Sequence, residues 1–180
     1  MGVAALCSGG LDSAVAAALR KADLLIFVDY GQQASRQECD AVFRLAKHFG
    51  AAVEAVECQL PCDEMNLPPG PGPRVVPGRN LALLGIGVAW ASHHARSTLV
   101  WGAAAGDHDN YPDCRSEFVS SVGEGAAAYR VRVEAPVLPW PRQRIREWAI
   151  AAGLPETFSC YAPVGFKHCG ECDSCRQDER

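Results

Sequence analysis

The fold of this chain is decided by the stretch VAALCSGGLDS, which spans residues 3–13. Its first part, residues 3–7, is a short apolar run, and we predict a buried strand there. Ser8, Gly9 and Gly10 end that run, and the alanine-rich stretch 14–21 that follows is typical of a helix. A strand that enters a helix through a pair of glycines indicates the first unit of an alternating α/β chain.

Apolar segments of two kinds alternate along the rest of the chain. Short aliphatic runs at 24–28, 52–58, 98–101 and 130–137 predict further strands, and longer stretches at 36–49, 80–94, 115–127 and 141–152 predict helices. Asn80 is the predicted N-cap of one helix, while Pro141 and Gly153 are predicted to begin and end another. The alternation predicts an α/β fold with a doubly wound, mainly parallel, five-stranded sheet.

The length of 180 residues and a hydrophobic content of 48% suit a single core. We predict an α/β domain at 1–155 and a metal-binding segment at 156–180 that packs on the same domain. Residues 59–78 carry six of the twelve prolines. Because strand–helix alternation resumes after them, we interpret them as a loop and not as a linker between domains.

Charge and composition exclude several classes of function. The formal net charge is -4 without a long basic stripe, which argues against nucleic-acid binding. The chain begins without the features of a signal peptide, and its longest apolar run, near 81–91, is shorter than the roughly 20 residues of a membrane span. Nine cysteines, an odd number, beside a large aliphatic core do not suit a secreted disulfide scaffold. We therefore expect a cytoplasmic protein with reduced thiols and no membrane partner.

The strand–glycine–helix junction is typical of an anion-binding site. Gly9 and Gly10 let backbone N–H groups approach a phosphate closely, and the N-terminus of the helix adds the positive end of its dipole. Ser8 and Ser13 can donate hydroxyl hydrogen bonds, and Asp12 could hold Mg²⁺ or orient a reacting group. No Gly-Lys-Ser/Thr follows, so this is not a kinase-type loop. An ordinary glycine turn is the structural alternative to a nucleoside triphosphate site.

Cysteines near the other end of the chain have the spacing of a metal site, Cys160-x8-Cys169-x2-Cys172-x2-Cys175. Cys-x2-Cys lets two sulfurs in one tight turn reach the same ion, and Gly170 provides the bend. Four thiolates fill the coordination sphere of a tetrahedral Zn²⁺, so we predict a structural zinc site. An iron–sulfur cluster and a set of reduced buried thiols are the alternatives.

The motif SGGLDS after the first strand resembles the signature of the PP-loop ATP pyrophosphatases, which have the adenine nucleotide alpha-hydrolase-like fold and adenylate a substrate. Within that superfamily, the chain resembles the 7-cyano-7-deazaguanine (preQ0) synthases of queuosine biosynthesis almost from end to end. The further motifs that carry this resemblance are Asp29-Tyr30-Gly31-Gln32, Val76-Pro77-Gly78-Arg79-Asn80, Gly102-Ala103 with Asp107, Tyr111-Pro112-Asp113-Cys114-Arg115 with Phe118, Ser159-Cys160-Tyr161 and Cys169-Gly170-x-Cys172-Asp173-Ser174-Cys175.

The resemblance implies a reaction, its cofactors and its partners. ATP with Mg²⁺ would adenylate the carboxylate of 7-carboxy-7-deazaguanine, ammonia would displace AMP to form an amide, and a second ATP would drive dehydration to the nitrile. A carboxylate is a poor electrophile, and adenylation provides it with a good leaving group. The resemblance also implies a homodimer.

Functional roles follow from the resemblance position by position. The residues expected to bind the nucleotide are Cys7, Ser8, Gly9, Gly10, Leu11, Asp12, Ser13, Arg79 and Asn80. The residues expected to bind the substrate are Tyr30, Gln32, Arg79, Asp107, Tyr111, Asp113 and Arg115. Asp12, Ser13, Asp113 and Arg115 are expected to be catalytic. An arginine can pair with a carboxylate through two hydrogen bonds, and an aspartate can accept from a guanine-like N1–H and amine.

Some positions differ from the pattern of the family. After Asp-Tyr-Gly-Gln the family continues with a basic residue and a histidine, whereas this chain has Gln33 and Ala34. Ala104 stands where a polar residue is common, Gly106 where an acidic one is common, and Arg142 where a lysine is usual. These differences lie on the presumed substrate side. They leave open which carboxylate is the acceptor and whether the product is a nitrile or an amide.

Other functions would use the same residues differently. A related synthetase could adenylate a different carboxylate. A tRNA thiolase would carry sulfur on Cys114 or on a zinc-site cysteine, although Cys114 is better explained as a small packing residue. A zinc-binding interaction module with a decayed nucleotide site is disfavoured by the intact Ser8, Asp12 and Ser13. For the Tyr-Pro-Asp-Cys-Arg motif, the alternative is an ordinary turn whose aspartate caps the next helix.

Overall fold

The structure of this protein is a computed structural model that describes residues 2–60, 70, 76–104 and 112–178. Most of the loop predicted at 59–78 lies outside the described residues, as do Gly106, Asp107 and Tyr111. Within the described ranges, none of the helices has both the length and the hydropathy that a bilayer crossing requires.

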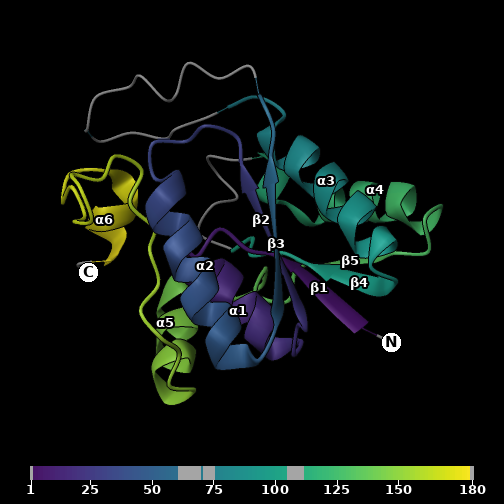
Figure 1. Ribbon diagram of the computed structural model, residues 1–180, viewed down its shortest axis with the longest axis horizontal. Coiled ribbons are helices and arrows are strands. Elements are labelled where there is room, and N and C mark those ends of the chain that lie inside the picture. The colour runs from purple at the N-terminus through teal and green to yellow at the C-terminus, as the bar shows by residue number, and fades with distance from the viewer. Residues whose placement is uncertain (1, 61–69, 71–75, 105–111, 179–180) are drawn as a thin grey trace.

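Five strands form one sheet in the order β3-β2-β1-β4-β5, and every neighbouring pair is parallel (Figure 1). The strands are β1 (Gly2–Leu6), β2 (Leu24–Asp29), β3 (Ala52–Glu57), β4 (Arg96–Val100) and β5 (Arg132–Glu134). Alternate residues of β2 enter different core clusters: Leu24, Ile26 and Val28 face one side of the sheet, and Leu25 and Phe27 face the other. The predicted α/β fold with a five-stranded parallel sheet is confirmed.

Helices cover both faces of this sheet (Figure 1). They are α1 (Leu11–Leu19), α2 (Ser35–Phe49), α3 (Arg79–His93), α4 (Ser116–Ala127) and α5 (Arg142–Ala151). On one face, Ala14 of α1 and Leu45 of α2 pack into a buried cluster with the sheet. On the other face, Leu84 of α3 and Ala126 of α4 belong to the larger cluster. Helix α5 packs on α1 through Ile145.

Some of the predicted boundaries are wrong. Asn80 is not the N-cap of α3, because the helix begins at Arg79 and its N-cap is Gly78, which has a φ of 73°. Glycine adopts this left-handed backbone without strain, and the helix begins without a side-chain capping bond. The strand predicted at 130–137 is limited to Arg132–Glu134, because residues 136–139 form turns. The short α6 (Asp173–Asp178) and the 3-10 turn η3 (Pro112–Cys114) were not predicted.

The strand order determines where a ligand can bind. From β1 the chain proceeds outward to β2 and β3 on one side, and it later returns to β4 and β5 on the other. In open α/β sheets, ligands bind outside the carboxyl ends of the strands at the point where the order reverses. The residues at this point are 7–10 after β1 and 101–104 after β4. The glycine motif therefore lies where this fold binds ligands.

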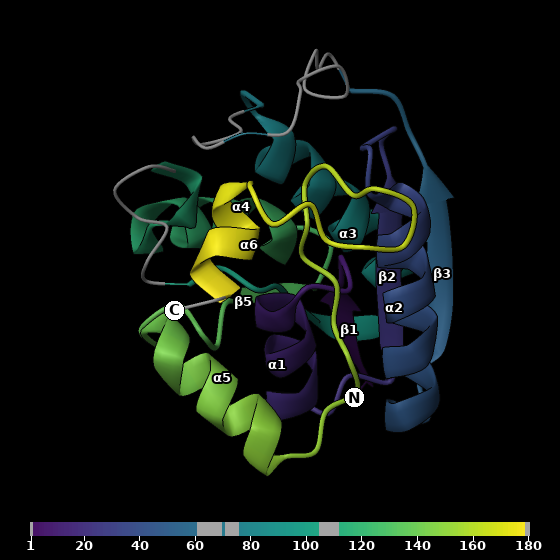
Figure 2. The same cartoon turned by 90° about the vertical axis from the view of Figure 1, so that its left-hand side faces the viewer.

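The C-terminal segment, residues 156–178, returns to the same end of the sheet. Figure 2 shows the segment passing between α1 and α2 before it turns into α6. On α2, Gln37 Nε2 donates to the carbonyl of Gly165 at 2.5 Å and Arg44 Nη2 donates to that of Glu156 at 3.5 Å. On α5, Arg146 donates to the carbonyl of Gln177. The N-terminal motif and the cysteine segment are thus neighbours in space.

Candidate functional site

The glycine loop, residues 7–13, joins the end of β1 to the first turn of α1. Gly10 is the N-cap of α1 and has an extended backbone, with φ -78° and ψ 162°. Gly9 has a φ of 78°, and a Cβ atom there would lie 2.7 Å from the carbonyl oxygen of Glu38 and 2.8 Å from Ala41 Cβ. Only glycine fits at this position, because the loop backbone lies directly against α2.

The N-terminus of α1 is open in the way that an anion site requires. The first N–H groups of a helix have no carbonyl partner within it, and they carry the positive end of the helix dipole. Within the described part of the chain, the structure shows no backbone acceptor for the N–H of Gly10. The N–H of Gly10 is therefore left for a ligand beyond the carboxyl ends of β1 and β4, where this type of sheet binds ligands.

Gly102 lets the end of β4 approach this loop. A Cβ atom at Gly102 would lie 2.4 Å from the backbone nitrogen of Ser13 and 2.5 Å from the carbonyl carbon of Asp12. Real Cβ atoms do not approach backbone this closely, so any larger residue would push β4 and α1 apart. The motif Gly102-Ala103 was noted in the sequence, but its packing role depends on the contact with α1.

Ser13 and Cys7 lie on the buried side of the loop. Ser13 Oγ donates to the carbonyl oxygen of Gly10 at 2.9 Å and lies 3.7 Å from Cys7 Sγ. Burial raises the pKa of the Cys7 thiol, so this group stays neutral at physiological pH. In this structure both side chains stabilise the turn.

Asp12 forms an ion pair with Arg142 beside the loop. Arg142 Nη1 lies 3.0 Å from Asp12 Oδ2, and the two side chains are 22% and 17% exposed. Arg142 is the first residue of α5, so this helix supplies positive charge next to the N-terminus of α1. The sequence identified Arg142 only as a difference from the family pattern. Its contact with Asp12 spans 130 residues and has no local signal.

The loop after β2 is held together by its own side chains. Gln32 Oε1 accepts from the N–H of Tyr30 at 2.9 Å, and Gln32 Nε2 donates to the carbonyl of Val28 and to Glu38. The N–H of Gly31 donates to the carboxylate of Asp29 at 2.8 Å. The amide of Gln32, expected to bind substrate, is therefore engaged within the protein, and the loop has one defined shape.

The remaining residues expected at the site begin helices. Arg79 and Asn80 form the first turn of α3, where Arg79 Nε donates to Asn80 Oδ1 at 3.5 Å. Asp113 lies in η3, and the exposed Arg115 is the N-cap of α4 and makes no side-chain capping bond. The alternative in which Asp113 caps the next helix is therefore wrong.

Cys114, the cysteine between Asp113 and Arg115, is part of the core. It is buried in the same hydrophobic cluster as Trp101, and Phe118 packs against that cluster. The interpretation of Cys114 as a small packing residue is confirmed. A buried thiol among apolar side chains is not placed to carry sulfur to a substrate.

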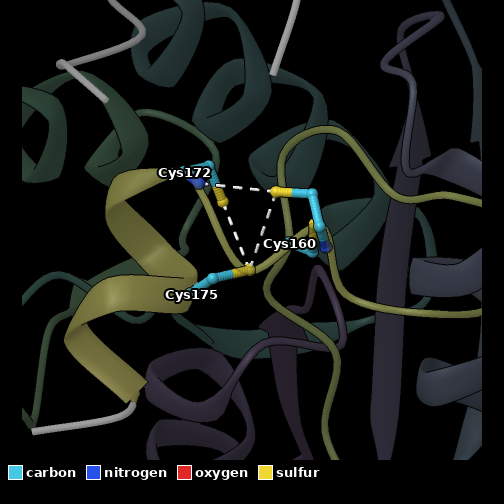
Figure 3. Close-up of side chains that lie close together, drawn as sticks. Cys160, Cys172 and Cys175 are labelled. Carbon is cyan, nitrogen blue, oxygen red and sulfur yellow. Dashed lines mark hydrogen bonds between the residues drawn. The ribbon is translucent and has the colours of Figure 1, made fainter. Parts of the chain in front are cut away.

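The cysteine cluster consists of Cys160, Cys169, Cys172 and Cys175. Their sulfur atoms all lie within 4.8 Å of one another. The sulfur of Cys175 is 3.4 Å from that of Cys172 and 3.9 Å from that of Cys169. Figure 3 shows the side chains of Cys160, Cys172 and Cys175 pointing toward one another. Sulfurs at about 2.3 Å from a tetrahedral ion lie roughly 3.8 Å apart, so the four thiols fit a single metal ion.

The surroundings shift the pKa of three of these thiols, and not all in the same direction. Burial raises the pKa of Cys160 and Cys175. For Cys169, burial also acts to raise the pKa, but N–H groups of Glu171 and Cys172 that donate to its sulfur outweigh burial and lower the pKa to about 7. The predicted bend at Gly170 is present, with a φ of 73°. One thiolate is thus available near neutral pH, and a cation would displace the other protons.

The match to known proteins covers nearly the whole chain. A family model described as "Queuosine biosynthesis protein QueC" matches residues 3–180. The chain belongs to the QueC family. It is 34% identical over 205 residues to the 7-cyano-7-deazaguanine synthase of Synechococcus sp. (strain CC9605), with 96% of this chain and 88% of the relative covered. It is 33% identical over 199 residues to that of Pseudomonas paraeruginosa (strain PA7), with 95% and 88% covered.

A solved structure shares the fold of this chain. The U34-tRNA thiolase NcsA from Methanococcus maripaludis with its 4Fe-4S cluster matches with a TM-score of 0.65 and 17% identity, over 94% of this chain and 62% of that chain. At this identity the likeness shows the fold alone, and the cluster of that protein says nothing about which ion the four cysteines of this chain would bind. The family that the motifs indicated is confirmed, and the glycine loop and the cysteine cluster belong to a QueC-family chain.

Proposed function

We propose that this QueC-family chain makes 7-cyano-7-deazaguanine from 7-carboxy-7-deazaguanine, ammonia and ATP, as a step of queuosine biosynthesis. The match of residues 3–180 to the family is the observation that carries the proposal. The glycine loop supports it, because an open helix N-terminus at the switch point of the sheet suits a triphosphate. The fold by itself would not choose this reaction, since one fold hosts many activities.

The proposed reaction has three steps. A carboxylate oxygen attacks the α-phosphorus of ATP, and the bond to the β-phosphate breaks with release of pyrophosphate. Ammonia then attacks the acyl carbon, AMP leaves, and loss of a proton gives the amide. In the last step the amide oxygen attacks the α-phosphorus of a second ATP and pyrophosphate leaves, and loss of both N–H protons with departure of AMP gives the nitrile. Negative charge grows on the departing pyrophosphate in both adenylations.

In this proposal the glycine loop holds the triphosphate. The N–H groups at the start of α1 donate to phosphate oxygens, and Ser8 lies beside them in the loop. Asp12 is oriented by Arg142 and binds Mg²⁺, which would neutralise charge on the departing pyrophosphate. Ser13 maintains the turn through Gly10 and can redirect its hydroxyl to a phosphate.

The rest of the loop and the start of α3 complete the proposed nucleotide site. Cys7 and Leu11 shape the loop, because Cys7 belongs to one core cluster and Leu11 packs against another. Arg79 and Asn80 are proposed to contact the nucleotide from the first turn of α3. A cationic side chain and an amide at a helix N-terminus both favour bound phosphate.

The substrate side is proposed on the loops that follow the strands. Arg115 would pair with the carboxylate through parallel hydrogen bonds, and Asp113 would accept from the N1–H and amine of the deazaguanine ring. The further residues proposed for this side are Tyr30, Gln32, Arg79, Asp107 and Tyr111. The internal bonds of Gln32 give it the role of holding this loop in shape.

We propose Zn²⁺ as the ion of the cysteine cluster. Four thiolates leave no open coordination position, so the ion would stabilise the C-terminal segment and would not activate water. A 4Fe-4S cluster also uses four thiolates, and metal analysis with visible absorption separates the two. In the same proposal residues 1–155 form the ATP-binding domain with 156–180 packed on it, and the enzyme acts in the cytoplasm as a homodimer.

A product assay tests the proposed function. Purified protein is incubated with ATP, Mg²⁺, ammonium and 7-carboxy-7-deazaguanine, and the products are identified by mass spectrometry while AMP is quantified. We expect the nitrile, with a second equivalent of AMP for each carboxylate consumed. An amide that accumulates with a single equivalent of AMP would show a synthetase that stops early. Absence of AMP above background would contradict the proposal, and other carboxylates would then be screened.

A further inference from the structure

We propose that Phe158 is a positioning residue whose backbone amide joins the cysteine cluster to the glycine loop, so that metal binding and ATP binding strengthen each other. The inference rests on the nucleotide site proposed above and extends it, because it gives the metal centre a role in ATP affinity. Phe158 and the glycine loop are far apart in the chain, but they are in contact in the structure.

The central contact is a hydrogen bond from the N–H of Phe158 to the carbonyl oxygen of Gly9, at 2.8 Å. A trans peptide is planar, and its C=O and the following N–H point in opposite directions. No described peptide bond is cis. Because the carbonyl of Gly9 points at Phe158, the N–H of Gly10 points away from the C-terminal segment. The bond therefore sets the direction of a donor that a phosphate would use.

Gly9 is held from its other side by α2. The position of its absent Cβ lies 2.7 Å from the carbonyl oxygen of Glu38 and 2.8 Å from Ala41 Cβ, so the loop cannot move closer to the helix. Gly10 is also close to the C-terminal segment, because a Cβ atom added at Gly10 would lie 3.7 Å from the carbonyl oxygen of Phe158. The loop is thus clamped between α2 and the segment that leads to Cys160.

Phe158 is itself held by the cysteine cluster. A single buried cluster contains Ala34, Ala41 and Phe158 together with Cys160, Cys172 and Cys175. Cys160, fully buried, follows Phe158 by only two positions. The ring of Phe158 lies 4.5 Å, between centroids, from that of His168, the neighbour of Cys169. An ion that fixes the cysteines therefore fixes the path of the chain at Phe158.

Linkage gives this arrangement a measurable consequence. If the metal-loaded segment holds the loop in its binding shape, metal increases the affinity for nucleotide by some factor. Nucleotide must then increase the affinity for metal by the same factor. The element with two states is the C-terminal segment, docked on the loop or released from it. We expect a factor of about ten, within the usual range of such couplings.

Metal release tests the coupling on the intact protein. Protein loaded with Zn²⁺ is mixed with a chromogenic chelator, with and without Mg²⁺ and α,β-methylene-ATP, an analogue that cannot be cleaved between these phosphates. We expect the analogue to slow zinc release about tenfold. Calorimetry with zinc-loaded and zinc-depleted protein should show a loss of analogue affinity by the same factor.

Variants at Phe158 separate the hydrogen bond from packing. Phe158→Pro removes the N–H donor, and Phe158→Leu keeps the donor and an apolar side chain. Thr157→Pro is the matched control, because the described structure shows no backbone acceptor for its N–H. We expect Phe158→Pro to retain Zn²⁺ but to lose the coupling between zinc and the analogue. The other two variants should keep both Zn²⁺ and the coupling. Should Phe158→Pro fail to fold, amide hydrogen exchange in the wild-type protein tests the inference instead. We expect the analogue to slow exchange in the peptide that contains Phe158 only when zinc is bound.

The outcomes distinguish this inference from the proposed function. Zinc release that is unchanged at saturating analogue, or an unreduced coupling in folded Phe158→Pro, would overturn the inference and leave the nucleotide site intact. In the exchange experiment, equal protection by the analogue with and without zinc would also overturn the inference. If the analogue does not bind zinc-loaded wild-type protein at all, the proposed nucleotide site is wrong and the inference fails with it.

Discussion

The glycine loop and the cysteine cluster are built in opposite ways. The glycine loop lacks a side chain at Gly9, where one would obstruct, and Gly102 after β4 lets the chain lie directly against it. In the described structure the N–H of Gly10 has no backbone acceptor. The cysteine cluster turns four side chains inward, with all sulfurs within 4.8 Å of one another. The first arrangement is suited to a ligand that arrives and leaves, and the second to an ion that remains. Changes in the loop should therefore affect chemistry more than stability, and changes in the cluster should do the reverse.

The largest expected effect comes from the cluster. Cys172→Ser removes a buried ligand, and if the ion is lost its binding free energy no longer stabilises the folded state, at a cost on the order of 3–5 kcal/mol. For a chain of this size that lowers the unfolding midpoint by roughly 10–15 °C. Metal analysis should find no stoichiometric ion, and calorimetry should show the shift. The control is Cys39→Ser, because Cys39 is a half-buried cysteine of α2 outside the cluster. This variant should keep the metal content and the unfolding midpoint of the wild type. A fully stable, metal-free Cys172→Ser protein would contradict a structural role.

Beside the glycine loop, Gly102→Ala should affect catalysis most. The new Cβ would lie 2.4 Å from the nitrogen of Ser13, so β4 and α1 must separate. A displacement of about 1 Å at a reacting centre costs on the order of 100-fold in rate. We expect kcat/KM for AMP formation to fall by about that factor while the metal content is unchanged. Gly125→Ala is the control, because a Cβ there meets nothing within 4 Å. Equal activity of the two variants would show that the approach of β4 to the loop is not needed.

A smaller effect is expected where the loop depends on a distant helix. Arg142→Lys keeps the positive charge near Asp12 but loses the geometry of the guanidinium group. We expect kcat/KM to fall about tenfold, which corresponds to the loss of one charged hydrogen bond. Steady-state assays over a range of Mg²⁺ concentrations should show a higher Mg²⁺ requirement, because Asp12 is less well oriented. Arg144→Lys on the same helix should leave both quantities unchanged.

The smallest effect concerns a cysteine that belongs to neither site. Cys114→Ser places a hydroxyl in an apolar cluster and should destabilise the protein by about 1 kcal/mol. The rate of AMP formation should stay within about twofold of wild type, measured beside the unfolding midpoint. Complete loss of activity with an unchanged midpoint would instead indicate a sulfur-carrying cysteine and would favour the thiolase chemistry.

Local patterns predicted most of the fold because each of its elements has a local signal. Periodicity distinguishes strands from helices within a few residues. The spacing of Cys169, Cys172 and Cys175 allows their sulfurs to reach one metal ion from a short stretch of chain. The prediction failed where the backbone conformation of one residue mattered. Asn80 has the chemistry of an N-cap, but the helix begins one residue earlier, at Arg79, and its N-cap is Gly78 with a left-handed backbone. The strand at 130–137 was predicted too long because its apolar run continues into turns that periodicity cannot detect.

The sequence by itself determined the strand–helix alternation, the glycine motif, the spacing of the cysteines and the QueC family. Each of these is a property of residues that are near one another in the chain, or of an ordered set of such motifs. Only the tertiary structure decided that Arg142 orients Asp12, that Gly102 admits the end of β4, and that Phe158 binds the carbonyl of Gly9. Those contacts depend on strand order and on how helices pack. No residue type signals them locally, because the partners meet only when the whole sheet is assembled.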